Sequence, residues 1–76
     1  MEETWNKKAT NILKSILTRR NIKYHELSIK LKALGIEETQ GSISNKISRG
    51  TFSFAFFLQC MYVLRINKID SNIGDN

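Results

Sequence analysis

The chain contains no proline among its 76 residues, and glycine occurs only at positions 35, 41, 50 and 74. Proline and glycine are the residues that most often interrupt helices, so their scarcity favours helical segments whose ends are marked by glycine. A chain of this length has room for one small hydrophobic core. The sequence therefore predicts an all-α fold, a compact bundle of four to five helices in a single domain.

Apolar residues recur every three or four positions, and this spacing predicts helices over about 4–20, 24–34, 38–48 and 54–64. The folded domain is expected to cover residues 1–66, followed by a polar tail over 67–76. The core is predicted from the inward positions of these helices. It comprises Trp5, Leu13, Leu17, Leu27, Leu31, Ile43, Ile47, Phe57 and Leu58.

The residues at the expected helix ends agree with these boundaries. Thr4 and Ser53 are suited to cap the first and fourth helices, and one of residues 37–39 is suited to cap the third. Gly35 and Gly50 follow the second and third helices and are placed to end them.

The charge of the chain is +5, from 12 Lys and Arg against 7 Asp and Glu. A positive net charge is typical of proteins that bind nucleic acid or another acidic partner. All of the excess falls within residues 1–35, whereas residues 36–58 are neutral. Charge therefore predicts phosphate contact without locating a surface that reads sequence.

The segment Thr39–Ser48 carries only Ile43 and Ile47 as an inward stripe, and its other side chains are mostly small amides and hydroxyls. Short polar side chains let a helix approach a groove closely, and amides bond base edges. Gly41 lowers helix stability by about 1 kcal/mol relative to alanine. Its position is explained either by packing against the preceding helix or by approach to DNA.

Residues that could support catalysis or metal binding are few. His25 is the only histidine and Cys60 the only cysteine, and one of each does not complete a standard zinc site. Cys60 lies in an apolar segment, where a thiol behaves as a small hydrophobic group. We therefore expect a cytoplasmic protein that is not an enzyme, with no cofactor, metal, membrane segment or small-molecule substrate.

The run Tyr24–Gly50 resembles the Cro and lambda-repressor-like helix-turn-helix proteins, with QGSISNKISRG at 40–50 resembling their recognition helix and its glycine stop. The sequence KISRGTFS at 46–53 also resembles a small family of uncharacterised bacterial helix-turn-helix domains. Either the helix over 24–34 or the turn after it is about one helical turn longer than in the usual motif. The turn also carries Glu37 and Glu38, which would repel phosphates unless they cap the helix over 38–48 or face away.

The resemblance implies that residues 39–48 lie in the major groove. Two groups of contacts follow from it. The base-reading residues are Gln40, Gly41, Ser44 and Asn45, and the phosphate contacts are Lys23, Thr39, Ser42, Lys46, Arg49 and Thr51.

The predicted function is sequence-specific binding of double-stranded DNA by a small transcriptional regulator. A homodimer would read two half-sites, joined through helix 54–64 or the tail. The alternative is a protein-interaction module of the same fold, an antitoxin or accessory regulator subunit, that uses the Phe-rich helix 54–64. RNA binding is a weaker rival because no exposed aromatic platform is evident.

Overall fold

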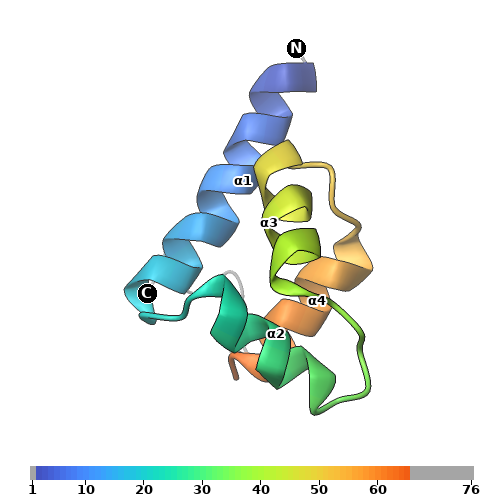
Figure 1. The fold of residues 1–76 in the computed structure, drawn as a ribbon. Coiled ribbons are helices and arrows are strands. Elements are labelled where there is room, and N and C mark those ends of the chain that lie inside the picture. Colours follow the sequence, from blue (N-terminus) through green and yellow to red (C-terminus); the bar gives the residue numbers. More distant parts are fainter. Residues whose placement is uncertain (1, 66–76) are drawn as a thin grey trace.

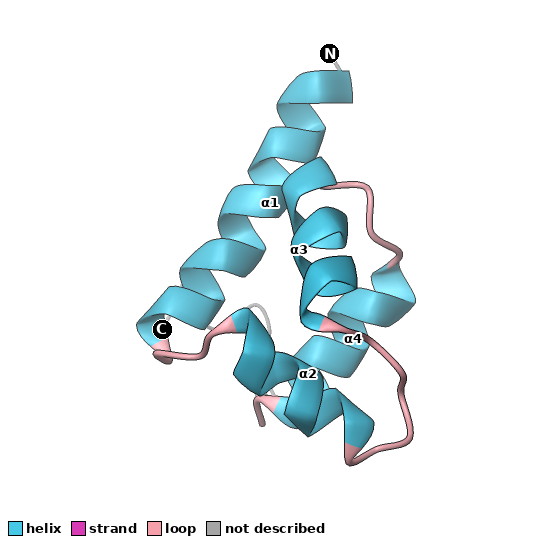
Figure 2. Ribbon diagram, viewed as in Figure 1, coloured by secondary structure: helices cyan, strands magenta, loops and turns pink. Residues whose placement is uncertain are grey.

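The computed structural model describes residues 2–65, and within them the chain forms four α-helices and no strand (Figures 1 and 2). These are α1 (Glu2–Arg19), α2 (Tyr24–Lys32), α3 (Gln40–Arg49) and α4 (Phe54–Val63). The all-α prediction is confirmed, with four helices rather than five in this range. The predicted tail, 67–76, lies outside the described residues.

The third helix is central to the arrangement. It lies alongside α1 and packs on α2, which in turn packs on α4 (Figure 1). Ile43 and Ile47 are its only buried side chains and have no exposed surface, as predicted. They meet a core contributed by every helix and by the residue after α4, namely Leu13, Leu17, Leu27, Leu31, Phe56, Cys60, Met61 and Leu64.

Three predicted core positions are wrong or only partly right. Trp5 is 66% exposed, because the first turns of α1 extend past the end of α3 and no other helix covers them (Figure 1). Leu58 is 43% exposed and Phe57 is half-buried, whereas Phe56 and Cys60 are buried. Helix α4 is apolar nearly all round, so its sequence pattern did not define which side faces inward.

The helix ends differ from the predictions by one or two residues. Helix α1 begins at Glu2, so Thr4 lies inside the helix and does not cap it. Helix α2 ends at Lys32 rather than at residue 34. The predicted cap of α4 is confirmed, since the hydroxyl of Ser53 accepts a hydrogen bond from the backbone N–H of Phe56 at 3.0 Å.

Gly50 ends α3 in the left-handed conformation, with φ of 70°, and also permits contact with α1. A Cβ atom at this position would lie 2.0 Å from the backbone oxygen of Asn6. The hydroxyl of Thr10 donates a hydrogen bond to the carbonyl of Ile47 at 2.5 Å, so it satisfies a C-terminal carbonyl of α3. Gly50 therefore fixes α3 against α1 as well as ending it.

None of the helices in the described part of the chain has both the length and the hydropathy needed to cross a membrane.

Candidate nucleic-acid interface

The side of α3 opposite Ile43 and Ile47 is exposed to solvent. Gly41, Asn45 and Arg49 follow one another at intervals of four residues and are all exposed. Residues four apart in a helix share a face, so these three form one ridge along α3. We call Gly41, Asn45 and Arg49 the outer ridge.

The remaining predicted base-reading residues lie next to the outer ridge. Gln40 is exposed, and Ser44 is half-buried one turn further along the same side of the helix. With Gly41 and Asn45, they occupy the exposed side of the first two turns of α3. The structure thus brings the four predicted base-reading residues together, and all four are uncharged.

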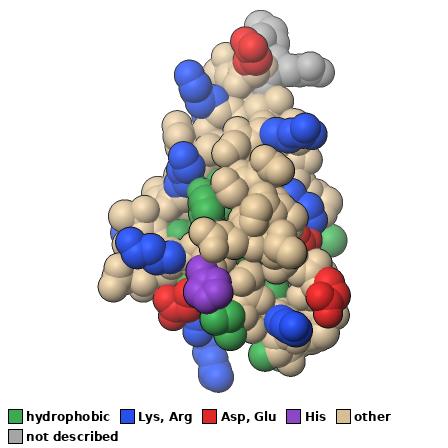
Figure 3. All heavy atoms as spheres, viewed as in Figure 1, with side chains coloured by type: hydrophobic (Ala, Val, Ile, Leu, Met, Phe, Trp, Pro, Cys, Tyr) green, Lys and Arg blue, Asp and Glu red, His purple; other side chains and the backbone are tan. Residues whose placement is uncertain are grey.

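Basic side chains from α1 and from the start of α2 border this face. Lys14 and Lys23 line a hollow together with Gln40. Lys14 also lines a second hollow with Lys7 and Arg49, where Glu3 is the one acidic residue. In Figure 3 the face that includes α3 is largely uncharged at its centre, with Lys, Arg and a few acidic side chains around its edge.

Lys7 and Lys14 were not among the predicted site residues. Their signal in the sequence was a spacing of seven, which places both on one side of α1 away from its apolar stripe. That spacing does not show which neighbour the side faces. The packing of α1 along α3 supplies this information, and it brings the N-terminal basic charge to the edge of the neutral helix.

Gly41 has no steric role within the described residues. A Cβ atom built on it would meet only the hydroxyl oxygen of Thr39, at 3.9 Å, which is an ordinary contact. Its φ is also not positive. Packing against α2 therefore does not explain this glycine, which leaves open space on the exposed surface of α3.

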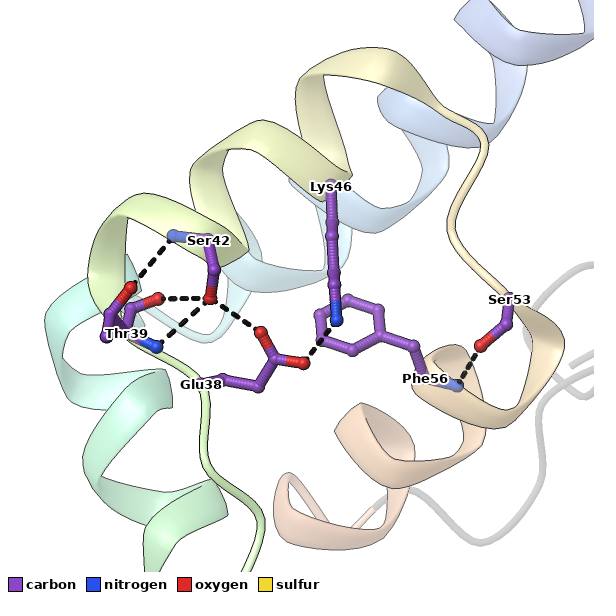
Figure 4. Close-up of polar contacts among 6 residues, drawn as sticks. All are labelled: Glu38, Thr39, Ser42, Lys46, Ser53 and Phe56. Carbon is purple, nitrogen blue, oxygen red and sulfur yellow. Dashed lines mark hydrogen bonds and ion pairs between the residues drawn. The ribbon is translucent and has the colours of Figure 1, made fainter.

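The residues just before α3 form a network of polar contacts (Figure 4). The backbone N–H of Ser42 donates to the hydroxyl of Thr39, and the backbone N–H of Thr39 donates to the hydroxyl of Ser42, both at 3.0 Å. This capping box satisfies N–H groups at the start of the helix. The Ser42 hydroxyl also donates to the carboxylate of Glu38 at 2.6 Å.

Glu38 also binds Lys46, whose ammonium forms an ion pair with the carboxylate and lies 5.0 Å from the centre of the Phe56 ring (Figure 4). Burial raises the pKa of Glu38. The hydrogen bonds from Lys46 and Ser42 outweigh that effect, so the pKa lies below its ordinary value. The network joins the segment before α3 to α3 and α4, and it neutralises one of the two acids predicted to repel phosphates.

The six predicted phosphate contacts thus fall into two groups. Thr39, Ser42 and Lys46 take part in the network before α3. Lys23, Arg49 and Thr51 are exposed, and no ion pair within residues 2–65 involves Lys23 or Arg49. These last three side chains are accessible to an external partner.

The residues with catalytic chemistry lie apart from this face. Cys60 is buried, and burial followed by the nearby Glu38 carboxylate raises the pKa of its thiol to about 12. A thiol with so high a pKa is a poor nucleophile at neutral pH. Residues 2–65 hold no cluster of three or more His, Cys, Asp or Glu side chains that could bind a metal ion.

Comparisons of the chain with curated proteins and with solved structures gave no match. A comparison with protein families matched residues 5–69, which include α2, α3 and α4 and most of α1. Because that match covers most of the sequence, the chain belongs to the family described as Domain of unknown function (DUF6471).

Proposed function

We propose that the protein binds duplex DNA sequence-specifically, as a small transcriptional regulator without catalytic activity. In this proposal α2 and α3 form a helix-turn-helix similar to that of the Cro and lambda-repressor-like proteins, and residues 39–48 enter the major groove. The connection between them, residues 33–39, is longer than the usual turn of three or four residues. The added length carries Glu38, whose carboxylate is bound by side chains of α3.

The observation that carries the proposal is Gly41. A glycine in a helix interior costs about 1 kcal/mol relative to alanine. Gly41, in the first turn of α3, costs part of that amount, although no contact within the described residues requires it. Close approach of an external surface would explain it. The flanking residues have the chemistry to read DNA at that distance, because the amides of Gln40 and Asn45 each bond adenine through two atoms.

The distribution of charge supports the same orientation. Phosphate contacts position a protein on DNA, whereas sequence is read by hydrogen bonds and apolar contacts to base edges. The exposed face of α3 is uncharged at its centre, and Lys14, Lys23 and Arg49 stand at its edge. Lys46 is neutralised by Glu38. We therefore expect Lys14, Lys23 and Arg49 to contact phosphates, with Lys46 contributing little.

The test is selection from a random duplex pool, followed by binding of the enriched sequence at several salt concentrations. We expect an enriched motif whose affinity falls steeply as salt rises. Arg49→Ala should weaken binding to all sequences and lower the slope of log affinity against log salt concentration by about 1. The matched variant Lys46→Ala should change neither the affinity nor this slope appreciably. Asn45→Ala should cost about 1–3 kcal/mol at one base pair and change the preferred sequence.

Two results would contradict the proposal. Absence of binding at low salt would exclude duplex DNA as the partner. Salt-sensitive binding without an enriched motif would exclude sequence reading by α3.

A second candidate function is the protein-interaction module, an antitoxin or accessory regulator subunit, which uses α4. The observation in its favour is that Phe54 and Tyr62 are each 70% exposed. Phe56 cannot be a contact residue in that function, because it is buried in the core. If this function is correct, the α3 variants have no effect and Phe54→Ala abolishes capture of the partner.

A further inference from the structure

One face of α4 exposes large apolar side chains. Phe54, Leu58 and Tyr62 are spaced four residues apart, so they lie along one side of the helix. The first and last are 70% exposed and Leu58 is 43% exposed. The ring of half-buried Phe57 stacks on that of Phe54 at 6.2 Å between centroids, which extends the surface toward the core. We call Phe54, Leu58 and Tyr62 the α4 stripe.

This stripe differs from the other exposed apolar residues in lacking charge. Helix α4 is the only one of the four described helices that carries no charged side chain. Trp5 and Ile12 are also exposed on α1, but the ammonium of Lys8 lies 4.7 Å from the centre of the Trp5 ring. A contact through the α4 stripe therefore buries no charge, and a contact through Trp5 would have to accommodate one.

We propose that the α4 stripe is the contact surface of a homodimer. Each copy of the chain carries a net charge of +5, so two copies repel one another, and a contact without charged side chains adds no close pairs of like charge to that repulsion. A stripe along one helix is also self-complementary under two-fold symmetry. Antiparallel packing would place Phe54 of one copy against Tyr62 of the other, with Leu58 at the centre. An acidic partner or an anionic membrane would find no cation on α4.

The two aromatic side chains of the stripe would bury less area than a stable dimer needs, so the contact must also include residues around them. A buried aromatic side chain covers about 150–250 Å², so the exposed parts of Phe54 and Tyr62 would bury roughly 550 Å² over the two copies. Stable interfaces bury about 1,200–2,000 Å² in total, with aromatic residues concentrated in the core. The α4 stripe would form the apolar core of the contact, and the residues around the stripe would form its rim. We therefore expect weak association that depends on protein concentration.

The experiment is sedimentation equilibrium of the full chain without DNA over a wide concentration range. The mean mass should rise with concentration from 8.8 kDa toward twice that value. Leu58→Lys puts like charges at the centre of the contact, so this variant should stay at the monomer mass. Tyr62→Ala should weaken association at least tenfold. Trp5→Ala is the matched control, because it removes a similarly exposed aromatic residue from α1 and should leave association unchanged.

Thermal unfolding followed by circular dichroism verifies that each variant is folded, as expected for substitutions at exposed positions. A mean mass of 8.8 kDa at every concentration of the unmodified chain would overturn the proposal. Undiminished association of Leu58→Lys and Tyr62→Ala would also overturn it, because the contact would then lie elsewhere. The measurement contains no DNA, so its outcome is independent of the proposed DNA binding.

Discussion

Gly41 and Gly50 stand near the two ends of α3, and the structure uses them in opposite ways. Gly50 has φ of 70°, and an added Cβ would lie 2.0 Å from the backbone of α1. Gly41 lacks a positive φ, and a Cβ added to it would meet only the hydroxyl oxygen of Thr39, at 3.9 Å. The fold therefore requires one glycine and not the other. The comparison supports the proposal that Gly41 leaves room for a ligand on the exposed side of α3.

The same contrast appears between two sides of α3. Ser42 and Lys46, on the side toward Phe56, bind the carboxylate of Glu38 and are satisfied internally. Asn45 and Arg49 on the outer ridge are exposed, and Arg49 forms no ion pair within residues 2–65. One side of the helix thus stabilises the fold, and the other remains accessible to a partner.

The largest effect is expected for Gly50→Ala, which should lower the free energy of unfolding by about 3 kcal/mol or more. Two causes combine, since alanine is strained at this φ and its Cβ collides with the backbone of Asn6. Urea denaturation followed by circular dichroism measures the loss.

Gly35→Ala is the control, because this residue also has a positive φ, 84°, but an added Cβ would have no neighbour within 4 Å. Strain alone should cost that variant about 1 kcal/mol. Equal losses in the two variants would show that close contact between α1 and the end of α3 does not contribute.

A smaller effect is expected for Glu38→Gln, about 1.5 kcal/mol at neutral pH. The carboxylate is largely buried, with 10% exposure, but Lys46 is 42% exposed and its contribution is screened by solvent. The folded-state pKa of Glu38 is lower than its ordinary value of 4.5. Its stabilisation should therefore be complete above pH 4.5 and disappear as pH falls through the lower folded-state pKa.

Urea denaturation of the unmodified protein and of Glu38→Gln, at neutral pH and at about pH 3, measures this dependence. The difference between the two proteins should shrink toward acid pH. A difference that is constant with pH would mean that the carboxylate charge has no stabilising role.

Local sequence signals predicted α3 well. Two isoleucines four residues apart identified its buried side, and Gly50 its end. The face of α4 was not predictable from periodicity, because Phe56, Phe57 and Leu58 are all apolar and only contacts with the other helices determine which is buried.

The edge of the candidate interface depends on contacts between residues distant in sequence, which local patterns do not reveal. Lys14 lines hollows with Gln40 and with Arg49 because α1 lies beside α3. Lys46 carries the charge expected of a phosphate contact. Its ammonium, however, forms an ion pair with Glu38, which lies eight residues earlier in the turn before α3. The four residues proposed to read bases could be grouped from the sequence, because they come from consecutive turns of one helix.

The smallest expected effect, Gly41→Ala, tests the comparison of the two glycines most directly. Alanine is the better helix former, and its Cβ meets only the hydroxyl of Thr39 at an ordinary distance, so the free energy of unfolding should rise, by up to about 0.8 kcal/mol. The same methyl group would hold a DNA groove away from α3, and affinity for the selected duplex should fall. Greater stability with unchanged affinity would mean that no ligand approaches this position, because a substitution that favours the helix and disfavours binding requires a partner at the outer ridge.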